Sequence, residues 1–195
     1  MSGLRFSILT PAVPSRLEAV GRLSAELGRQ IGGRAVEHLV LLDNKRRTVG
    51  EKRDALLRAA RGEWVAFCDD DDWVAPDYVG AIWGALAGNP DVVTFRQGAT
   101  VDGVEGEIEF RLGAANEAFC PGGVARRNAW HVCVWRRRLA ILSFFPAVNY
   151  GEDWAFAERL CGLPGLREAH VPRVLHFYRH DRARTEAPAP GDGRS

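Results

Sequence analysis

The chain has 195 residues, of which 46% are apolar, and its formal net charge at neutral pH is +1. This length predicts one domain with a sizeable core, and so small a net charge excludes a global field that would recruit nucleic acid or a membrane. The four cysteines form no Cys-x-x-Cys pair, so we expect free thiols rather than a zinc site or a disulfide framework. The N-terminus lacks a signal-peptide pattern and no apolar run reaches membrane-spanning length. We therefore expect a cytoplasmic protein.

The first part of the chain alternates between predicted buried strands and helices, which implies a right-handed parallel unit. Prolines at 11 and 14 end the first strand, and Ser15 with Glu18 has the spacing of a capping box. Thr48 with Glu51 has the same spacing at the start of the second helix. The predicted strands are 5–9, 38–42 and 64–68, and the predicted helices are 17–31 and 49–60.

Four consecutive aspartates, Asp69 to Asp72, follow the third predicted strand directly. Adjacent carboxylates repel one another, so stability alone does not explain the cluster. A hard divalent cation does, because Mg²⁺ and Mn²⁺ take oxygen ligands, usually one or two carboxylates together with substrate phosphates. In open α/β sheets, ligands bind beyond the carboxyl ends of the strands, where this run lies. The alternative interpretation is a solvated acidic turn.

Basic residues crowd the first turn of the second predicted helix. Cations at a helix N-terminus oppose the macrodipole, at a cost of about 0.3–1 kcal/mol each. A bound diphosphate would remove this conflict, because helix N-termini favour anions. The alternative is a set of solvated side chains on an exposed turn. The residues concerned are Lys45, Arg46, Arg47, Lys52 and Arg53.

The remainder of the chain is predicted to contain shorter elements. Asp102 and Gly103 predict the turn of a hairpin over 100–112. Glu152 and Asp153, after a glycine, open a helix that extends to residue 161. The other predicted elements are a helix over 76–87, strands over 91–97, 169–171 and 174–178, a glycine-rich loop over 113–125 and a disordered tail over 183–195.

The stretch from 126 to 142 combines arginines with tryptophans and contains no acid. One interpretation is a surface for an acidic or aromatic acceptor, on which a phosphate backbone or a displaced base could bind. The other is an amphipathic strand and helix with arginines in solvent and tryptophans in the core, and we favour it. The candidate acceptor residues are Trp130, Arg136 and, further along the chain, Trp154.

Five elements, taken in order, resemble the family 2 nucleotide-sugar glycosyltransferases with the GT-A fold. They are the first strand with Thr10-Pro11, the second strand ending in Asp43-Asn44, Gly50 to Asp54 with the aspartate run, Gly151-Glu152-Asp153, and Tyr178-Arg179-His180. The resemblance implies an α/β fold with a Rossmann-like, mostly parallel sheet flanked by helices and a small C-terminal acceptor-side portion. It predicts one domain over 1–182, with a nucleotide-sugar-binding half at about 4–97 and an acceptor and catalytic half at 98–182.

The resemblance also implies roles for individual residues. Asp43 would bind the nucleotide base in a pocket lined by Thr10 and Pro11, with Lys52 and Arg53 near the diphosphate. The aspartate run matches the Asp-x-Asp motif, so Asp70 would contact the ribose and Asp71 the metal, with Asp69 and Asp72 as alternative ligands. Asp153, next to Glu152, matches the general base. His180 matches a late histidine of the metal and diphosphate site, but its spacing departs from the family pattern, so His176 competes with it.

The implied activity is inverting, metal-dependent transfer of a hexosyl or pentosyl group from a nucleoside-diphosphate sugar to an acceptor hydroxyl, with Mn²⁺ or Mg²⁺ as cofactor. The expected acceptor is a saccharide or a lipid-linked saccharide. A hydroxymethylated base in DNA is a second hypothesis, and a non-catalytic nucleotide-binding module is a third. A sugar-phosphate pyrophosphorylase is disfavoured because residues 10–14 lack the glycine-rich loop that such enzymes carry after the first strand.

Overall fold

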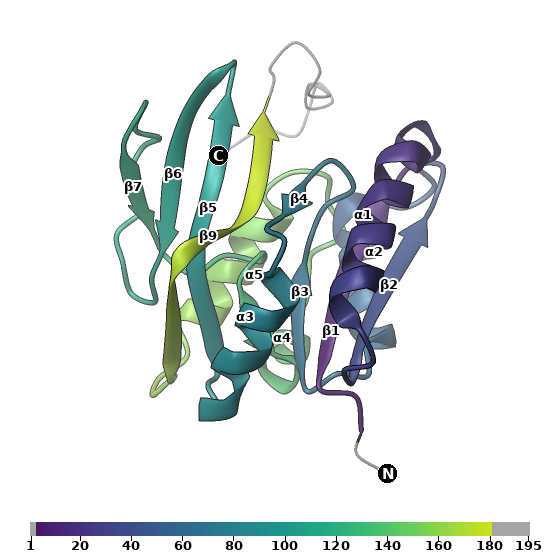
Figure 1. Ribbon diagram of the computed structural model, residues 1–195, viewed down its shortest axis with the longest axis horizontal. Helices are drawn as coiled ribbons and strands as arrows, with labels where there is room; N and C mark the ends of the chain where they lie inside the picture. Colours follow the sequence, from purple (N-terminus) through teal and green to yellow (C-terminus); the bar gives the residue numbers. More distant parts are fainter. Residues whose placement is uncertain (1–2, 181–195) are drawn as a thin grey trace.

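The computed structural model describes residues 3–180 as a mixed α/β fold (Figure 1). Its sheet has the strand order β2-β1-β3-β8-β5-β6-β7, with β9 beside β5 and β4 beside β9. The predicted disordered tail, 183–195, lies outside the described residues. No helix within 3–180 is long and apolar enough to cross a membrane. The strands are β1 Phe6–Ala12, β2 Val36–Leu42, β3 Trp64–Phe67, β4 Trp73–Val74, β5 Val92–Val101, β6 Val104–Phe110, β7 Val124–Arg127, β8 Val134–Arg136 and β9 Glu168–His180; the α-helices are α1 Leu17–Ile31, α2 Val49–Ala59, α3 Tyr78–Ala85, α4 Arg137–Ser143 and α5 Glu152–Cys161.

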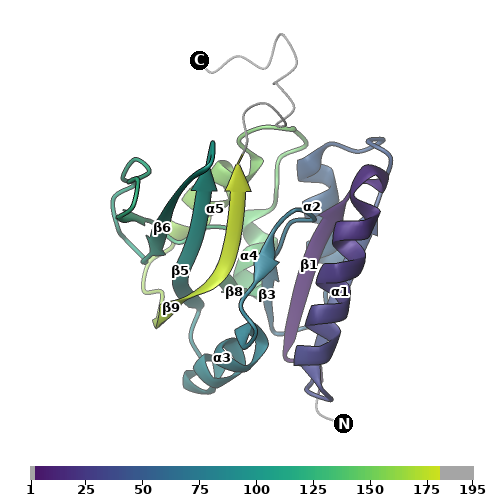
Figure 2. The ribbon, with the colours of Figure 1, turned by 45° about the horizontal axis from the view of Figure 1, so that its top comes forward.

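Helices cover both faces of the sheet, so the molecule has three layers (Figures 1 and 2). On one face, Leu23 and Leu27 of α1 and Ile82 of α3 pack against buried residues of β1, β3 and β5. On the other face, Leu57 of α2 and Phe156 of α5 belong to a second core cluster together with residues of α4. The central strands β1 and β3 are thus buried on both sides, as expected for strands that read as continuous apolar runs.

The sheet consists of two parts that differ in strand direction. In the parallel half, β2-β1-β3, both neighbouring pairs run parallel. The mixed half contains β5, β6, β7 and β9, with parallel ladders between β5 and β9 and between β6 and β7 and an antiparallel hairpin of β5 and β6. The short strand β8 joins the halves by antiparallel pairing with β3 and β5. Most paired residues lie in parallel ladders, in agreement with the predicted sheet.

Several local predictions are confirmed. Thr48 and Glu51 form the capping box at the start of α2, with each side chain bonded to the other's backbone N–H. Gly32 ends α1 in the left-handed conformation, at φ 49°. Asp102 and Gly103 both have positive φ, at 50° and 83°, in the two-residue turn between β5 and β6.

Other local predictions are wrong for identifiable reasons. Ser15 does not cap α1, because residues 14–16 form a short 3-10 helix and Arg16 occupies the cap position without a side-chain bond. Pro11 does not end β1, which continues to Ala12 beside β2. The pairing of β1 with β3 stops at Leu9, so the missing N–H of Pro11 is not needed there.

Two strand predictions are corrected as well. β2 is only half-buried, because it lies at the outer edge of the sheet in the strand order. The two predicted late strands belong to one strand, β9. Its register against β5 shifts between Phe95 and Arg96, where Val171 pairs with the former and Val174 with the latter. This bulge accommodates Pro172, which lies in the gap between the two predicted strands.

Candidate active site

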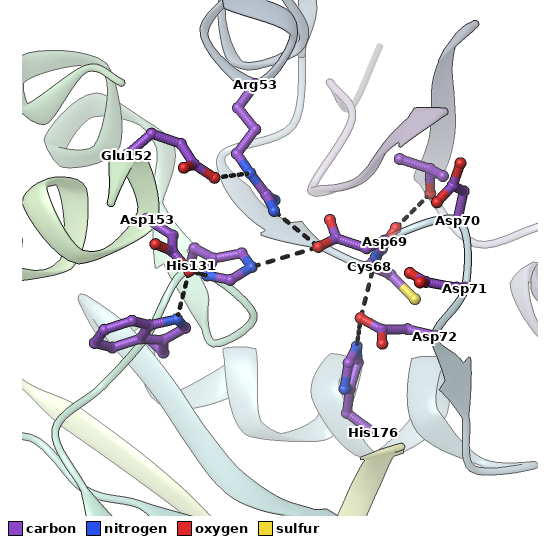
Figure 3. Close-up of polar contacts among 12 residues, drawn as sticks. Arg53, Cys68, Asp69, Asp70, Asp71, Asp72, His131, Glu152, Asp153 and His176 are labelled. Carbon is purple, nitrogen blue, oxygen red and sulfur yellow. Dashed lines mark hydrogen bonds and ion pairs between the residues drawn. The ribbon is translucent and has the colours of Figure 1, made fainter. Parts of the chain in front are cut away.

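The aspartate run lies where it was predicted, at the carboxyl end of β3. The N–H of Cys68 donates to the carbonyl of Leu9 (3.0 Å), and the hydroxyl of Thr10 donates to the carbonyl of Cys68 (2.8 Å). These bonds fix the start of the run beside the end of β1. In Figure 3 the four aspartates fan out from this point in different directions.

Asp70 points toward the connection between β1 and α1. One of its carboxylate oxygens accepts from the N–H of Val13 (2.9 Å), and the other accepts from the guanidinium of Arg16 (2.7 Å). The residue is only 4% exposed. Asp70 therefore anchors the β1–α1 connection through both of its oxygens, whatever contact it makes with a ribose.

Asp71 is the most weakly neutralised member of the run. Partial burial, together with the charges of Asp72, Asp69 and Asp70, raises its pKa to about 6, against the opposing effect of Arg16. A guanidinium nitrogen of Arg16 lies 3.1 Å from Asp71 Oδ2. Arg16, which the sequence interpretation did not single out, thus partly neutralises the run and leaves Asp71 with excess negative potential.

Asp72 is paired with a histidine of β9. His176 is fully buried, and its Nε2 lies 3.3 Å from Asp72 Oδ2. Its Nδ1 lies 2.9 Å from the amide nitrogen of Gln97 on β5, which fixes the ring between the two strands. Of the two competing histidines, His176 is therefore the one beside the aspartate run. His180 lies at the far end of β9, where its ring stacks on Tyr178.

Asp69 belongs to a buried ion-pair network with Arg53 and Glu152 (Figure 3). A guanidinium nitrogen of Arg53 lies 2.7 Å from Asp69 Oδ2, and its Nε lies 3.3 Å from Glu152 Oε1. Burial alone would raise the pKa of Asp69, but the charges and hydrogen bonds of Arg53 and His131 together outweigh it and lower that pKa. Burial also raises the pKa of Glu152, opposed by Arg53. Glu152 is therefore the ion-pair partner of Arg53. Of the two acids predicted to be catalytic, only Asp153 is free of this ion pair.

Asp153 is held at the start of α5 with its carboxylate toward the centre of the site. Gly151 precedes the helix at φ 76°, a conformation that strains any other residue, and so directs Glu152 and Asp153 to different partners. Asp153 Oδ1 accepts from the N–H of Trp154 (2.7 Å), and Oδ2 accepts from the indole N–H of Trp130 (3.2 Å).

His131 is a site residue that the sequence interpretation missed. Its carbonyl accepts from the N–H of Phe67 (3.3 Å), which places the residue beside the end of β3. Its ring lies between two acids, with Nε2 3.9 Å from Asp69 Oδ2 and Nδ1 3.8 Å from Asp153 Oδ2 (Figure 3). The only sequence signal was one titratable side chain inside the apolar run 129–134.

These groups surround a hollow of about 280 Å³, which we call the central hollow. Around it, four buried polar atoms have no hydrogen-bond partner within 3–180: Arg53 Nη1, Asp69 Oδ1 and both ring nitrogens of His131. Unpaired buried polar atoms are costly and rare in folded proteins, so their concentration here points to a polar ligand. The lining residues are Arg53, Asp69, Asp72, Gln97, Ile108, Phe110, Arg127, Trp130, His131, Val132, Asp153 and Tyr178.

The other predicted nucleotide-binding residues lie at the same edge of the sheet. Asp43 follows β2, and its N–H donates to Ala12 at the end of β1 (3.2 Å). Lys52 is buried, with its ammonium 3.5 Å from the carbonyl of Ala12. Thr10 and Pro11 are both buried within β1, and Thr10 uses its hydroxyl to bond Cys68.

The backbone donors at the N-terminus of α2 are already occupied within the protein, which argues against a bound diphosphate as the reason for its basic residues. The N–H of Val49 donates to the side chain of Asn149 (3.1 Å), and that of Gly50 donates to the carbonyl of Val148 (3.0 Å). The next two N–H groups bond to Thr48. A side chain at position 50 would lie 1.8 Å from the carbonyl oxygen of Pro146, so glycine is needed for this close contact.

Two of the three predicted acceptor residues, Trp130 and Trp154, are brought together, and the third, Arg136, is not. Trp130 lines the central hollow, and Trp154 packs edge-to-face on it with ring centroids 5.5 Å apart. Arg136 lies at the opposite end of β3, over the ring of Trp64 and 3.3 Å from Asp91. Its assignment to the acceptor site is therefore wrong. It lies in β8 next to the first residue of β3, whereas the site forms beyond the last one.

The donor atoms of the run fit a divalent cation that is completed by substrate. Within the described part of the chain, no group of three or more His, Cys, Asp and Glu residues is arranged to hold a metal ion alone. Mg²⁺ and Mn²⁺ do not need such a group when they bind one or two carboxylates plus phosphates. The unpaired oxygen of Asp69 and the raised pKa of Asp71 are the features that a cation would relieve.

Solved structures with the same architecture identify the fold. The crystal structure of S. aureus TarS gives a TM-score of 0.62 at 13% identity, over 90% of this chain and 36% of that chain. TarS 1–349 in complex with UDP gives 0.60 at 13% identity, over 90% and 60% of the two chains. TarS 1–349 in complex with UDP-GlcNAc gives 0.60 at 12% identity, over 98% and 62%. The fold is the GT-A fold, and the chain spans about one to two thirds of the length of these structures.

The family follows from the sequence. The profile described as glycosyl transferase family 2 matches residues 37–138, which is more than half of the chain. The chain therefore belongs to glycosyl transferase family 2. No curated protein matches it.

Proposed function

We propose that the protein transfers a sugar from a nucleoside-diphosphate sugar to an acceptor hydroxyl, with inversion at the anomeric carbon. The observation that carries this proposal is the central hollow with its unpaired buried polar atoms. A hydroxyl-rich ligand both donates and accepts hydrogen bonds, which matches the donor on Arg53, the acceptor on Asp69 and the two ring nitrogens of His131.

In the proposed reaction, Asp153 on one side of the central hollow acts on the acceptor, and the aspartate run on the other side binds the donor. The acceptor oxygen attacks the anomeric carbon while the bond from that carbon to the β-phosphate oxygen breaks, and the bonding electrons leave with the diphosphate. Asp153 takes the proton of the attacking hydroxyl, as a carboxylate within hydrogen-bond reach can do. The indole of Trp130 and the N–H of Trp154 hold this carboxylate in place. Attack on the face opposite the leaving group inverts the anomeric centre.

The donor side is expected to be the edge of the sheet with the aspartate run. Asp43 and Lys52 lie at the ends of β2 and β1 for the nucleotide. Asp71, with Asp69 or Asp72 as the second ligand, would hold Mg²⁺ or Mn²⁺, which supplies positive charge against the developing charge of the diphosphate. Because two of the similar structures are complexes with UDP and UDP-GlcNAc, uridine diphosphate sugars are the first donors to test.

The acceptor is proposed to be a saccharide, whether free or lipid-linked, rather than DNA. A phosphate backbone needs available cations, and the arginines of the stretch 126–138 already have partners within the protein. Arg136 and Arg138 pair with Asp91, and Arg126 pairs with Glu109. Arg127 and Arg137 donate to the backbone carbonyls of Glu117 and Gly62. A cytoplasmic location stays a prediction.

The experiment that tests this function is release of nucleoside diphosphate from a panel of nucleotide sugars, with Mn²⁺, Mg²⁺ or EDTA. Each donor is assayed alone, with mono- and oligosaccharides, and with hydroxymethylated DNA. Metal-dependent release that a saccharide stimulates, with inverted product stereochemistry by NMR, is the expected result. If only DNA stimulated the release, the acceptor would be a hydroxymethylated base in DNA instead of a saccharide. Nucleotide binding without release under any condition would favour a non-catalytic module.

A further inference from the structure

A second hollow lies behind the aromatic pair of the active site. It has a volume of about 310 Å³, and Trp130 forms a wall of both this hollow and the central one. We call it the outer hollow. Its volume lies at the lower end of the range for small-molecule sites, about 300–1,000 Å³. It borders the segments before and after β7, through Asn116 and Asn128, and α5, through Trp154 and Glu158.

The polar groups of the outer hollow suit a neutral, hydroxyl-bearing ligand. The side-chain oxygen of Asn128 accepts from the N–H of Gly113 (2.9 Å) and of Ala129 (2.9 Å). The side-chain oxygen of Asn116 accepts from the N–H of Asn128 (3.0 Å). Because the amide oxygens are used in this way, the two residues can offer their NH₂ groups to a ligand as donors, and Glu158 adds an exposed acceptor.

The aromatic wall adds an apolar face to these polar groups. Trp154 is 48% exposed although it lies directly after the candidate base. Its ring meets that of Trp130 at 69°, so the two indoles form a corner between the two hollows. A flat, exposed aromatic face beside amide and carboxylate groups offers both contacts that a sugar ring needs, one for its C–H face and one for its hydroxyls.

We propose that the outer hollow binds a second sugar ring of the acceptor, so that the enzyme recognises an oligosaccharide whose reactive ring occupies the central hollow. This inference rests on the proposed function. Continuity supports it, because Trp130 forms a wall of both hollows and donates to the carboxylate of Asp153. Charge favours a saccharide over a polynucleotide, because the lining of the outer hollow includes Glu158 but no arginine or lysine.

The test is binding to an array that carries oligosaccharides of two to four rings, the corresponding monosaccharides, and single- and double-stranded DNA. The wild type should bind at least one oligosaccharide with a Kd at least tenfold below that of its monosaccharide. Trp154→Ala should abolish this difference. Asn128→Asp, which keeps the two accepted backbone bonds but removes the NH₂ donors, should reduce it. Trp73→Ala is the matched control, because Trp73 is similarly exposed, at 41%, and lines neither hollow.

Three outcomes would overturn the inference: no saccharide bound, a preference for oligosaccharides that survives both variants, or binding to DNA alone. Release of nucleoside diphosphate by the same preparations separates this inference from the proposed function. If the protein turns over a donor but binds no oligosaccharide, the proposed outer subsite is wrong and the proposed transferase activity stands. If the protein prefers oligosaccharides to monosaccharides but turns over no donor, the outer subsite stands and the proposed reaction is wrong.

Discussion

The parallel half and the mixed half of the sheet each form one side of the central hollow, and they supply side chains in different ways. The parallel half presents four consecutive aspartates on a single connection after β3. The mixed half and its helix contribute single residues from separate segments, namely His131 before β8, Asp153 on α5 and His176 on β9. The difference teaches that one side of a site can be encoded as a local motif, whereas the other side is assembled by tertiary structure.

The largest expected effect on stability comes from removing Arg53, which links Asp69 after β3 to Glu152 on α5. Arg53→Leu leaves the carboxylates of Asp69 and Glu152 without their shared cation, which costs about 3–5 kcal/mol in the free energy of unfolding. Denaturant unfolding of the variant measures the loss. Arg58→Leu on the same helix is the matched control, since Arg58 forms an exposed pair with Asp54 worth about 0.5 kcal/mol or less. If the two variants lost equal amounts of unfolding free energy, Arg53 would not be the stabilising link between Asp69 and Glu152.

The next effect concerns kcat and the proposed base, Asp153. Asp153→Asn keeps the shape of the side chain but removes the base, so we expect kcat to fall by about 10²–10⁴-fold. The thermal unfolding midpoint should fall only slightly, because the amide oxygen keeps one of the two hydrogen bonds that the carboxylate accepts, from Trp154 or from Trp130, while the NH₂ group loses the other. Asp54→Asn on the outer side of α2 serves as the control. Full transfer activity in Asp153→Asn would rule out this residue as the base.

A smaller effect is expected where α2 meets the segment before α5. Gly50→Ala places a methyl group against the carbonyl of Pro146 and should destabilise the protein by about 1–3 kcal/mol. Gly21→Ala, in an open position on α1, should stabilise it by up to about 1 kcal/mol. The two variants are compared by thermal unfolding. A neutral result for Gly50→Ala would show that the segment moves away at little cost.

The smallest effect lies within the parallel half and depends on pH. Burial lowers the pKa of His38 to about 4, from an ordinary value of 6.5. As the pH falls from about 6.5 to 4, the unfolded chain binds a proton that the folded chain does not, so the free energy of unfolding decreases by about 1–3 kcal/mol. His38→Gln should remove this part of the pH dependence in denaturant titrations. An unchanged slope in the variant would assign it to other groups.

The sequence was informative where function and local structure share a short stretch. The aspartate run after β3, the capping box of α2 and the acids that open α5 are each visible within about six residues. Long-range contacts were not visible in this way. Nothing near Gly50 indicates that Val148 and Asn149 occupy the first two donors of the helix, and nothing near His131 indicates that Asp69 and Asp153 lie on either side of its ring. Arg136 was misassigned because composition does not say toward which end of a strand a residue lies.

The shortness of β8 has a mechanical consequence. This strand joins the two halves through two residue pairs with β3 and two with β5. A sheet held by so few backbone bonds at its centre bends most easily along that line. A ligand that contacts Asp69 and Asp153 together would span the line and stiffen the molecule, and the amide protons of β8 would then exchange with solvent more slowly.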